Sequence, residues 1–204
     1  MKVVAVSQRV DTFPERSETR DGLDRRLIAL LLSAKYLPVP IPNLLSEPTI
    51  DFKGGNESLM SWLACVKPQA FILSGGNDIG QCLDRDLLES YVLEYAVQNQ
   101  KPLLGICRGM QMMAVWAGVQ LKLVEGHVRT RHRICGEING EVNSYHNLVL
   151  THCPTDFRIL AKSEDGEIEA IRHQSLPLEG WMWHPERERS FVPEDLHRLR
   201  NLFN

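Results

Sequence analysis

The sequence predicts an α/β fold built around a mostly parallel sheet. Short apolar runs suited to buried strands alternate with longer segments suited to helices through the first 118 residues. Pro38 and Pro40 interrupt the run 37–41, so this segment is expected at a sheet edge or as a short strand. The other expected strands are 2–7, 70–73 and 103–106, and the expected helices are 21–35, 58–66 and 83–98.

After residue 118 the pattern changes to short extended pieces that indicate hairpins. Asn139-Gly140 is typical of a type I′ turn and lies between the expected strands 134–138 and 141–144. Glu164-Asp165-Gly166 suggests a second hairpin, between 158–161 and 168–172. The tail 193–203 is expected to form a closing helix. No repeat or linker interrupts the chain, so we expect one domain spanning 1–204.

Composition excludes several functional classes. A hydrophobic fraction of 43% and a charged fraction of 24% are ordinary for a soluble globular protein. The net charge of −3 offers no basic footprint for nucleic acid. No apolar run approaches the ~20 residues that a membrane helix needs, so we expect a cytoplasmic protein without membrane contact. Five cysteines without Cys-x-x-Cys spacing argue against a disulfide framework or a zinc site.

The segment Gly105-Ile106-Cys107-Arg108-Gly109 lies between an expected strand and a helix-compatible run. A Gly-x-Cys-x-Gly pattern in that place is typical of a nucleophile elbow, a sharp turn that exposes the central side chain. Gly105 and Gly109 are expected to permit the turn because glycine adopts positive φ without a Cβ clash. The positive end of the helix favours the thiolate of Cys107, which we interpret as a nucleophile. The remaining cysteines are interpreted as small buried hydrophobes: Cys65, Cys82, Cys135 and Cys153.

A base for this nucleophile is predicted at Trp183-His184-Pro185-Glu186. Pro185 disfavours the helical region for His184 and is expected to hold the segment extended. Residues i and i+2 of an extended segment project to the same side, so His184 and Glu186 would share a face. Taken alone, this tripeptide also fits a solvated turn. The order Cys107, His184, Glu186 favours a nucleophile, a base and the carboxylate that orients it.

The segments 105–111 and 183–186 together resemble the class I glutamine amidotransferase superfamily. Within it, the chain is similar to the stand-alone γ-glutamyl-γ-aminobutyrate hydrolase (peptidase C26-like) group, with further matching stretches at 71–79 and 142–146. The resemblance implies a three-layer, flavodoxin-like α/β fold with a nucleophile elbow and C-terminal β-hairpins. It also implies a hydrolase with the catalytic triad Cys107, His184 and Glu186. Such an enzyme would cleave the amide of a small γ-glutamyl substrate through a γ-glutamyl thioester, without a cofactor.

Further residues are expected around the substrate. The backbone amides of Gly76, which follows Gly75, and of Arg108 would stabilise the oxyanion, although spacing alone fits an ordinary turn at 75–76 equally well. In the resembling family, Gln111 holds the γ-glutamyl group. A polar strip lies near its α-amino and α-carboxylate groups: Asn143, Ser144, Tyr145 and His146. His146 fits a structural histidine equally well.

No metal site is predicted, because the other histidines show no ligand spacing. They are expected at the surface: His127, His132, His152, His173 and His197.

The leaving group is expected to meet loops around the mouth of the site, at 9–24, 77–84 and 126–133. Arg9 and Arg20 would bind a phosphate or carboxylate, or else belong to a solvated helix start. The third loop carries a basic cluster that fits either anion binding or a solvated charge run: His127, Arg129, Arg131, His132 and Arg133. The segments 7–11 and 20–24 resemble γ-glutamyl-CDP-amidate hydrolases, which implies an anionic or nucleotide leaving group.

Two other functions are open on the sequence. The chain would also fit the glutaminase subunit of an ammonia-channelling synthetase, but the sequence supplies no synthetase domain, and Gly-Ile-Cys-Arg-Gly with arginine at 108 favours a free-standing enzyme. A catalytically silent binding module on the same fold is the third interpretation, but it has no physical need for Cys107, His184 and Glu186 together. Whether the chain forms a homodimer is left open.

Overall fold

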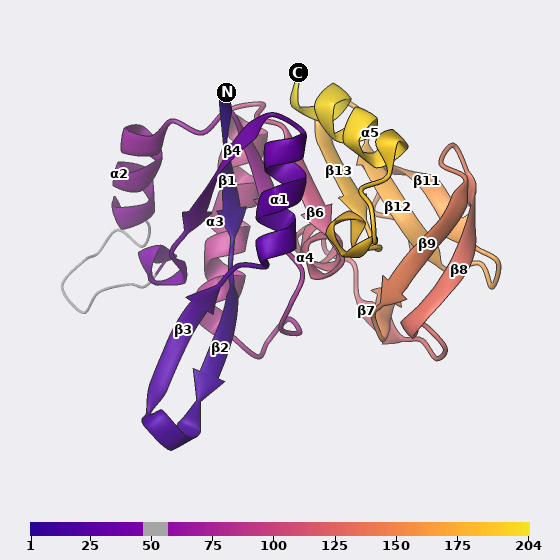
Figure 1. Ribbon diagram of the computed structural model, residues 1–204, viewed down its shortest axis with the longest axis horizontal. Helices are drawn as coiled ribbons and strands as arrows, with labels where there is room; N and C mark the ends of the chain where they lie inside the picture. Colours follow the sequence, from indigo (N-terminus) through magenta and orange to yellow (C-terminus); the bar gives the residue numbers. More distant parts are fainter. Residues whose placement is uncertain (47–56) are drawn as a thin grey trace.

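The computed structural model describes residues 1–46 and 57–204. Within those residues, nine strands form one sheet, and its order is β4-β1-β5-β6-β13-β12-β11-β8-β9 (Figure 1). The first five strands pair in parallel: β4 (Tyr36–Ile41), β1 (Lys2–Ser7), β5 (Ala70–Leu73), β6 (Leu103–Ile106) and β13 (Leu178–Trp181). The remainder pair antiparallel: β12 (Ile168–His173), β11 (Phe157–Ser163), β8 (Val128–Gly136) and β9 (Gly140–Tyr145).

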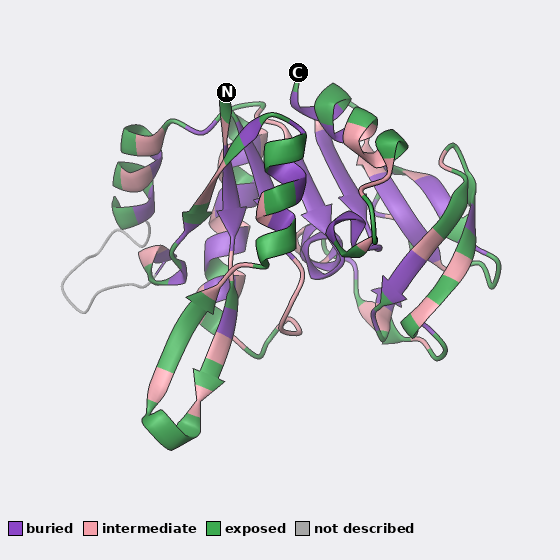
Figure 2. Ribbon diagram, viewed as in Figure 1, coloured by how far each residue is buried: buried purple, intermediate pink, exposed green. Residues whose placement is uncertain are grey.

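Helices cover both faces of the parallel half, which gives the expected three layers. One face packs against α1 (Arg25–Ser33) and α5 (Pro193–Phe203). The other face packs against α2 (Glu57–Val66), α3 (Leu83–Gln98) and α4 (Arg108–Trp116). Successive side chains of β1 point into different layers, with Val4 and Val6 in the first and Ala5 in the second. Figure 2 shows the central strands buried between helices whose outer surfaces are exposed.

The sequence predicted these elements well where hydrophobic patterning is strong. The expected strands 2–7, 70–73 and 103–106, the edge strand near 37–41 and the helices 83–98 and 193–203 are confirmed. Both C-terminal hairpins are also confirmed, as β8–β9 and β11–β12. The turn of the first hairpin differs, because residues 135–139 separate the last pair, Ile134 and Gly140. The side chain of Asn139 bonds to both the amide and the carbonyl of Gly136, which stabilises this wider loop.

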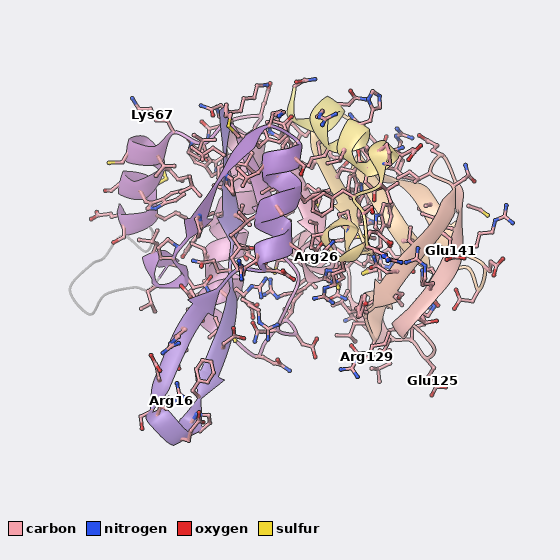
Figure 3. The ribbon with its side chains drawn as sticks, viewed as in Figure 1. Arg16, Arg26, Lys67, Glu125, Arg129 and Glu141 are labelled. Atoms are coloured by element: carbon pink, nitrogen blue, oxygen red, sulfur yellow. The ribbon has the colours of Figure 1, made fainter. Side chains whose placement is uncertain are left out.

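The segment expected to be a loop after the first strand is instead a β-hairpin. β2 (Arg9–Phe13) pairs antiparallel with β3 (Glu18–Gly22), joined by the short 3-10 helix η1 (Pro14–Arg16). The hairpin projects from the body of the protein, and Arg16 lies at its tip (Figures 1 and 3). The helix expected at 21–35 therefore begins only at Arg25. Asp24 caps it, because its side chain accepts a hydrogen bond from the amide of Arg26 at 2.8 Å.

Some elements and exposures were not predicted. The strands β7 (Leu121–Leu123), β10 (Leu148–Leu150) and β13 were missed, and η2 (Asn43–Ser46) follows β4. The interpretation of the other cysteines as buried is wrong: Cys65 and Cys135 are exposed, and Cys82 and Cys153 are half-buried. No helix in the part of the chain that the structure describes is long and apolar enough to cross a membrane.

Gly105 and Gly109 are required by close packing rather than by backbone angle. Neither has positive φ, contrary to the expectation from sequence. A Cβ on Gly105 would lie 2.6 Å from the carbonyl carbon of Gly109, and a Cβ on Gly109 would collide with the carbonyl oxygen of Leu73. The two glycines therefore let α4 approach the ends of β5 and β6.

We expect the Gly109→Ala substitution to destabilise the fold by about 1–3 kcal/mol, because backbone at Leu73 cannot move away from the new methyl group. Urea unfolding at constant slope measures this change. Leu87→Ala, at a position that is 43% exposed on α3, is the control and should change stability by only about 0.5 kcal/mol. Equal stability of the Gly109→Ala protein and the wild type would contradict the packing argument.

Candidate active site

Cys107 occupies a sharp turn between β6 and α4. Its φ of 51° and ψ of −106° are unusual for a residue with a Cβ and cost on the order of 1–3 kcal/mol. The turn is held by backbone hydrogen bonds from the Cys107 amide to the Trp181 carbonyl at 2.7 Å and from the Gln111 amide to the Cys107 carbonyl at 3.1 Å. The strand, the strained residue and the helix form the expected nucleophile elbow, with Cys107 itself carrying the positive φ.

His184 and Glu186 are in direct contact. Nδ1 of His184 lies 2.6 Å from Oε1 of Glu186, and both residues are buried. His184 itself is extended as expected, with φ of −107° and ψ of 91°, but Pro185–Arg187 form a 3-10 turn, η3, that begins with proline. Arg26 at the start of α1 (labelled in Figure 3) donates from Nε to the carbonyl of Glu186 at 2.7 Å and so fixes this turn.

The environment of His184 favours its charged form. Burial lowers its pKa, but the neighbouring Cys107 and Glu186 outweigh burial and raise the pKa from 6.5 to about 9. The ring packs against Gly75, where a Cβ would lie 2.5 Å from its Cε1 atom. Glycine at 75 is therefore needed for the imidazole to stand beside the loop that follows β5.

That loop, residues 74–76, is held in place by the buried side chain of Arg85. Nη2 of Arg85 donates to the carbonyls of Ser74 at 2.7 Å and Gly75 at 3.1 Å. With both carbonyls turned toward Arg85, the loop keeps a fixed conformation, in which Gly76 has a φ of 129°. A Cβ on Gly76 would come within 2.8 Å of Arg85 Nη1, so a larger residue does not fit.

Arg85 belongs to a buried ion network that also fixes the elbow. Its Nε lies 3.0 Å from Oε1 of Glu89, and the guanidinium of Arg108 pairs with Glu89 and Asp86. Ser7 at the end of β1 donates to Glu89 at 2.8 Å. The side chain of Arg108 is thus committed to α3.

Arg85 and Glu89 were not predicted from the sequence. They stand four residues apart on the stripe of α3 that also carries Leu88 and Val92, which are fully buried. Opposite charges at this spacing on an apolar stripe were the available signal. Positions that face the core admit charges only when these are paired, so such a pair indicates a buried network.

Most residues of the expected substrate strip face inward. The side chain of Asn143 holds the backbone of His184, with bonds of 2.8 Å to its carbonyl and 3.0 Å from its amide. Ser144 donates to the carbonyl of His127 at 2.6 Å, and Gln111 donates to the carbonyl of Leu148 at 2.9 Å. These three side chains and His146 are buried; Tyr145 alone of the strip is exposed.

Tyr145 reaches the site through its ring. The edge of this ring meets His184 with 5.7 Å between centroids, and the guanidinium of Arg187 lies 4.6 Å above its face. Arg187 was not predicted, because it directly follows the His184-Pro185-Glu186 motif and belongs to no motif itself.

A cavity of about 440 Å³ opens beside His184. It lies between the 74–76 loop, η3 and the base of the β2–β3 hairpin, and its lining includes Arg9, Asp11, Asp24 and Arg187. Arg9 is therefore brought to the site as expected. Arg20 lies farther out on β3, where it pairs with Glu18 at 2.7 Å and stacks over Phe13.

The basic cluster 127–133 lies on the far antiparallel part of the sheet and is not among the residues that line this cavity. Figure 3 labels Arg129, which belongs to this cluster, and Glu125, which lies just before it in the chain. Arg131 pairs with Glu141 at 2.7 Å and with Glu188 at 2.9 Å. The expectation that His127 lies at the surface is wrong, since it is only 4% exposed. It packs against His132 and His146, with ring centroids 4.6 Å and 4.9 Å away.

Comparison with known proteins identifies relatives of this chain. A gamma-glutamyl-CDP-amidate hydrolase from Campylobacter jejuni is 36% identical over 126 residues. These residues are 59% of this chain and 63% of the hydrolase, so the match spans less than two thirds of the hydrolase. A glutamine-hydrolyzing GMP synthase subunit from Thermococcus kodakarensis is 30% identical over 156 residues, covering 70% of this chain and 79% of the archaeal protein.

Solved structures share the fold. A protein from Thermoplasma acidophilum that is described as a GMP synthase subunit superposes with a TM-score of 0.71 at 20% identity, covering 100% of this chain and 94% of that one. A glutamine amidotransferase from Thermotoga maritima gives 0.62 at 13% identity, covering 91% and 76%. Residues 50–203 match the family described as Glutamine amidotransferase class-I. The chain therefore belongs to the class I glutamine amidotransferase family.

Proposed function

We propose that this chain is a cysteine-dependent hydrolase that cleaves the amide bond of a small γ-glutamyl conjugate. The observation that carries the proposal is the elbow at Cys107 beside the buried pair of His184 and Glu186. A positively charged His184 stabilises a neighbouring thiolate, and Glu186 orients the ring through Nδ1. The relatives that hydrolyse γ-glutamyl-CDP-amidate or glutamine support the same class of reaction.

The reaction proceeds in two halves. The Cys107 thiolate attacks the γ-carbonyl carbon, a C–S bond forms, and the C–N bond breaks as His184 delivers its proton to the leaving nitrogen. Neutral His184 then takes a proton from water, whose oxygen attacks the thioester carbon. The C–S bond breaks, glutamate leaves, and the thiolate and the charged imidazole are restored. The amides of Gly76 and Arg108 are proposed to stabilise the oxyanion in both halves.

The cavity supports an anionic leaving group. Arg9 and Arg187 both line it, although Asp11 and Asp24 line it too and Arg9 pairs with Asp11 at 2.7 Å. Arginine binds phosphate or carboxylate through two parallel hydrogen bonds. Arg9 also packs against Gly76, where a Cβ would lie 2.8 Å from the Arg9 Cβ atom. A phosphate held there would be next to the proposed oxyanion site. We therefore propose γ-glutamyl conjugates that carry phosphate or a nucleotide as the preferred substrates.

A second candidate is a glutaminase that supplies ammonia to a separate synthetase. The similarity to the glutamine-hydrolyzing GMP synthase subunit over 70% of this chain supports it. The chemistry at Cys107 would be the same, with ammonia as the leaving group. Turnover without a partner protein or ATP distinguishes a free-standing hydrolase from a glutaminase that depends on its synthetase.

The first expected outcome concerns the nucleophile. Treating the protein with a γ-glutamyl affinity label should modify Cys107 alone, which peptide mass spectrometry detects. The exposed Cys65 and Cys135 provide internal controls, because they are accessible to the label. Cys107→Ala should abolish both labelling and turnover. A label on another cysteine would overturn the assignment.

The second expected outcome is an alkaline limit on activity. His184 must be protonated to release the amine, so kcat/KM should fall as pH rises through about 9. Because this pKa is raised above its ordinary 6.5, charged His184 also stabilises the fold below about pH 6.5, and that stability is lost as pH rises through about 9.

Glu186→Gln tests the cause of this limit. Glu186 raises the pKa of His184, so its neutral replacement should move the alkaline limb of the kcat/KM profile to lower pH. Glu194→Gln, in the first turn of α5, is a matched control and should leave the limb in place. An unchanged limb in Glu186→Gln would remove Glu186 from the mechanism.

The third expected outcome concerns the leaving group. Across glutamine, γ-glutamyl-γ-aminobutyrate, a γ-glutamyl polyamine and a γ-glutamyl nucleotide amidate, the last should have the highest kcat/KM. Arg9→Ala should lower that value about tenfold and leave the rate with glutamine nearly unchanged, because a charged hydrogen bond contributes about 1.5–3 kcal/mol. Arg20→Ala, on the neighbouring strand of the same hairpin, is the control. Equal rates across the panel would show that Arg9 is only a surface charge.

A further inference from the structure

Three histidines and one glutamate meet between the β8–β9 hairpin and β12, away from the residues that line the catalytic cavity. His127 precedes β8, His132 lies on it, His146 follows β9, and Glu169 lies on β12. One side-chain ligand atom from each lies within 4.8 Å of all the others. Three of these residues are almost completely buried, with exposures of 4% for His127, 3% for His146 and 0% for Glu169.

These side chains are short of hydrogen-bond partners. Among the residues that the structure describes, nine buried side-chain nitrogen or oxygen atoms have no partner, and six of the nine belong to this cluster. They include Nδ1 of His127, Nε2 of His132, Nε2 of His146 and both carboxylate oxygens of Glu169. Each such group costs about 1–3 kcal/mol if it stays unsatisfied. An ion that all of them bind would remove most of that cost.

The distances from Glu169 to the three histidines fit neighbouring ligands of one metal ion better than hydrogen bonds. Oε1 of Glu169 lies 3.5 Å from both His127 Nδ1 and His146 Nε2, and Oε2 lies 3.4 Å from His132 Nε2. Hydrogen bonds between nitrogen and oxygen are shorter, about 2.7–3.2 Å. In a tetrahedral site with bonds of about 2.0–2.1 Å, neighbouring ligand atoms are about 3.3–3.4 Å apart.

The second nitrogen of His127 is also occupied in the manner typical of metal-binding histidines. Its Nε2 lies 2.8 Å from Oδ2 of Asp165, in the turn between β11 and β12. A carboxylate that accepts this proton fixes the tautomer and leaves Nδ1 free to bind a metal.

We propose that His127, His132, His146 and Glu169 bind one divalent transition-metal ion. The ligands are imidazole nitrogens and a carboxylate, which suit Zn²⁺ best among common ions. Because the ligands are largely buried, the site is a structural one that fastens the β8–β9 hairpin to β12. The same hairpin supplies Asn143, which holds the backbone of His184.

The test measures metal binding without turnover, so its result is independent of the proposed hydrolase activity. Cys107→Ala protein is used throughout, because a reactive thiol beside a histidine also binds zinc. After dialysis against a chelator and then buffer, titration with Zn²⁺ should give one ion per chain. At free Zn²⁺ about 100-fold above Kd, the Tm should rise by about 5–10 °C.

Substitutions in this background locate the site. His132→Gln and His146→Gln should each lose stoichiometric Zn²⁺ binding and the Tm shift, whereas His152→Gln, at an exposed position, should retain both. His132 is only half-buried, so its variant is the less disruptive of the two. Co²⁺ bound to the Cys107→Ala protein should absorb visible light but show no thiolate-to-cobalt charge-transfer band. This measurement requires no further substitution.

Three outcomes would overturn the proposal. They are the absence of stoichiometric Zn²⁺ or Co²⁺ binding, equal binding by His132→Gln and His152→Gln, and a thiolate band in the Co²⁺ spectrum, which would place the ion on Cys65 or another cysteine.

Discussion

The buried pairing of Arg85 and Arg108 with Glu89 is the interaction on which the catalytic end of the sheet depends. Three elements that carry chemistry converge on it: the end of β1 through Ser7, the 74–76 loop through its carbonyls, and the elbow through Arg108. With Asp86, which also pairs with Arg108, the network holds two cations and two carboxylates. Loss of one partner therefore leaves an uncompensated charge, which costs several kcal/mol. The network thereby makes the positions of the loop and of the elbow interdependent.

His184 is held from three directions that are far apart in the sequence. Glu186 binds its ring, Asn143 binds its backbone, and Gly75 gives the ring room to approach. Arg26 fixes the turn that carries Glu186. A histidine supported in this way spends little free energy on reorientation when a substrate enters, which is the physical meaning of preorganisation.

The sequence was sufficient for elements whose hydrophobic period is strong and for motifs whose residues are neighbours. Cys107 and the pair His184 and Glu186 were predicted from adjacent positions, and the structure brings them together. Contacts between segments that are distant in the sequence could not be predicted. The segment that contains Arg9–Phe13 and Glu18–Gly22 was expected to be a loop, because its largely polar residues show no clear alternation of apolar and polar positions. The cluster around Glu169 joins three segments that are distant in the sequence, so its spacing carries no short pattern.

The two prolines of the edge strand β4 determine at which edge another strand could extend the sheet. Pro38 and Pro40 stand two residues apart, so their backbone nitrogens point to the same side of the strand. That side is the outer one, because β4 is hydrogen-bonded to β1 and proline has no N–H to donate. The outer side therefore lacks two N–H donors that an incoming strand would need. Growth of the sheet by addition of a strand from another molecule is blocked at this end and is left to the β9 edge, whose Gly140–Tyr145 backbone contains no proline.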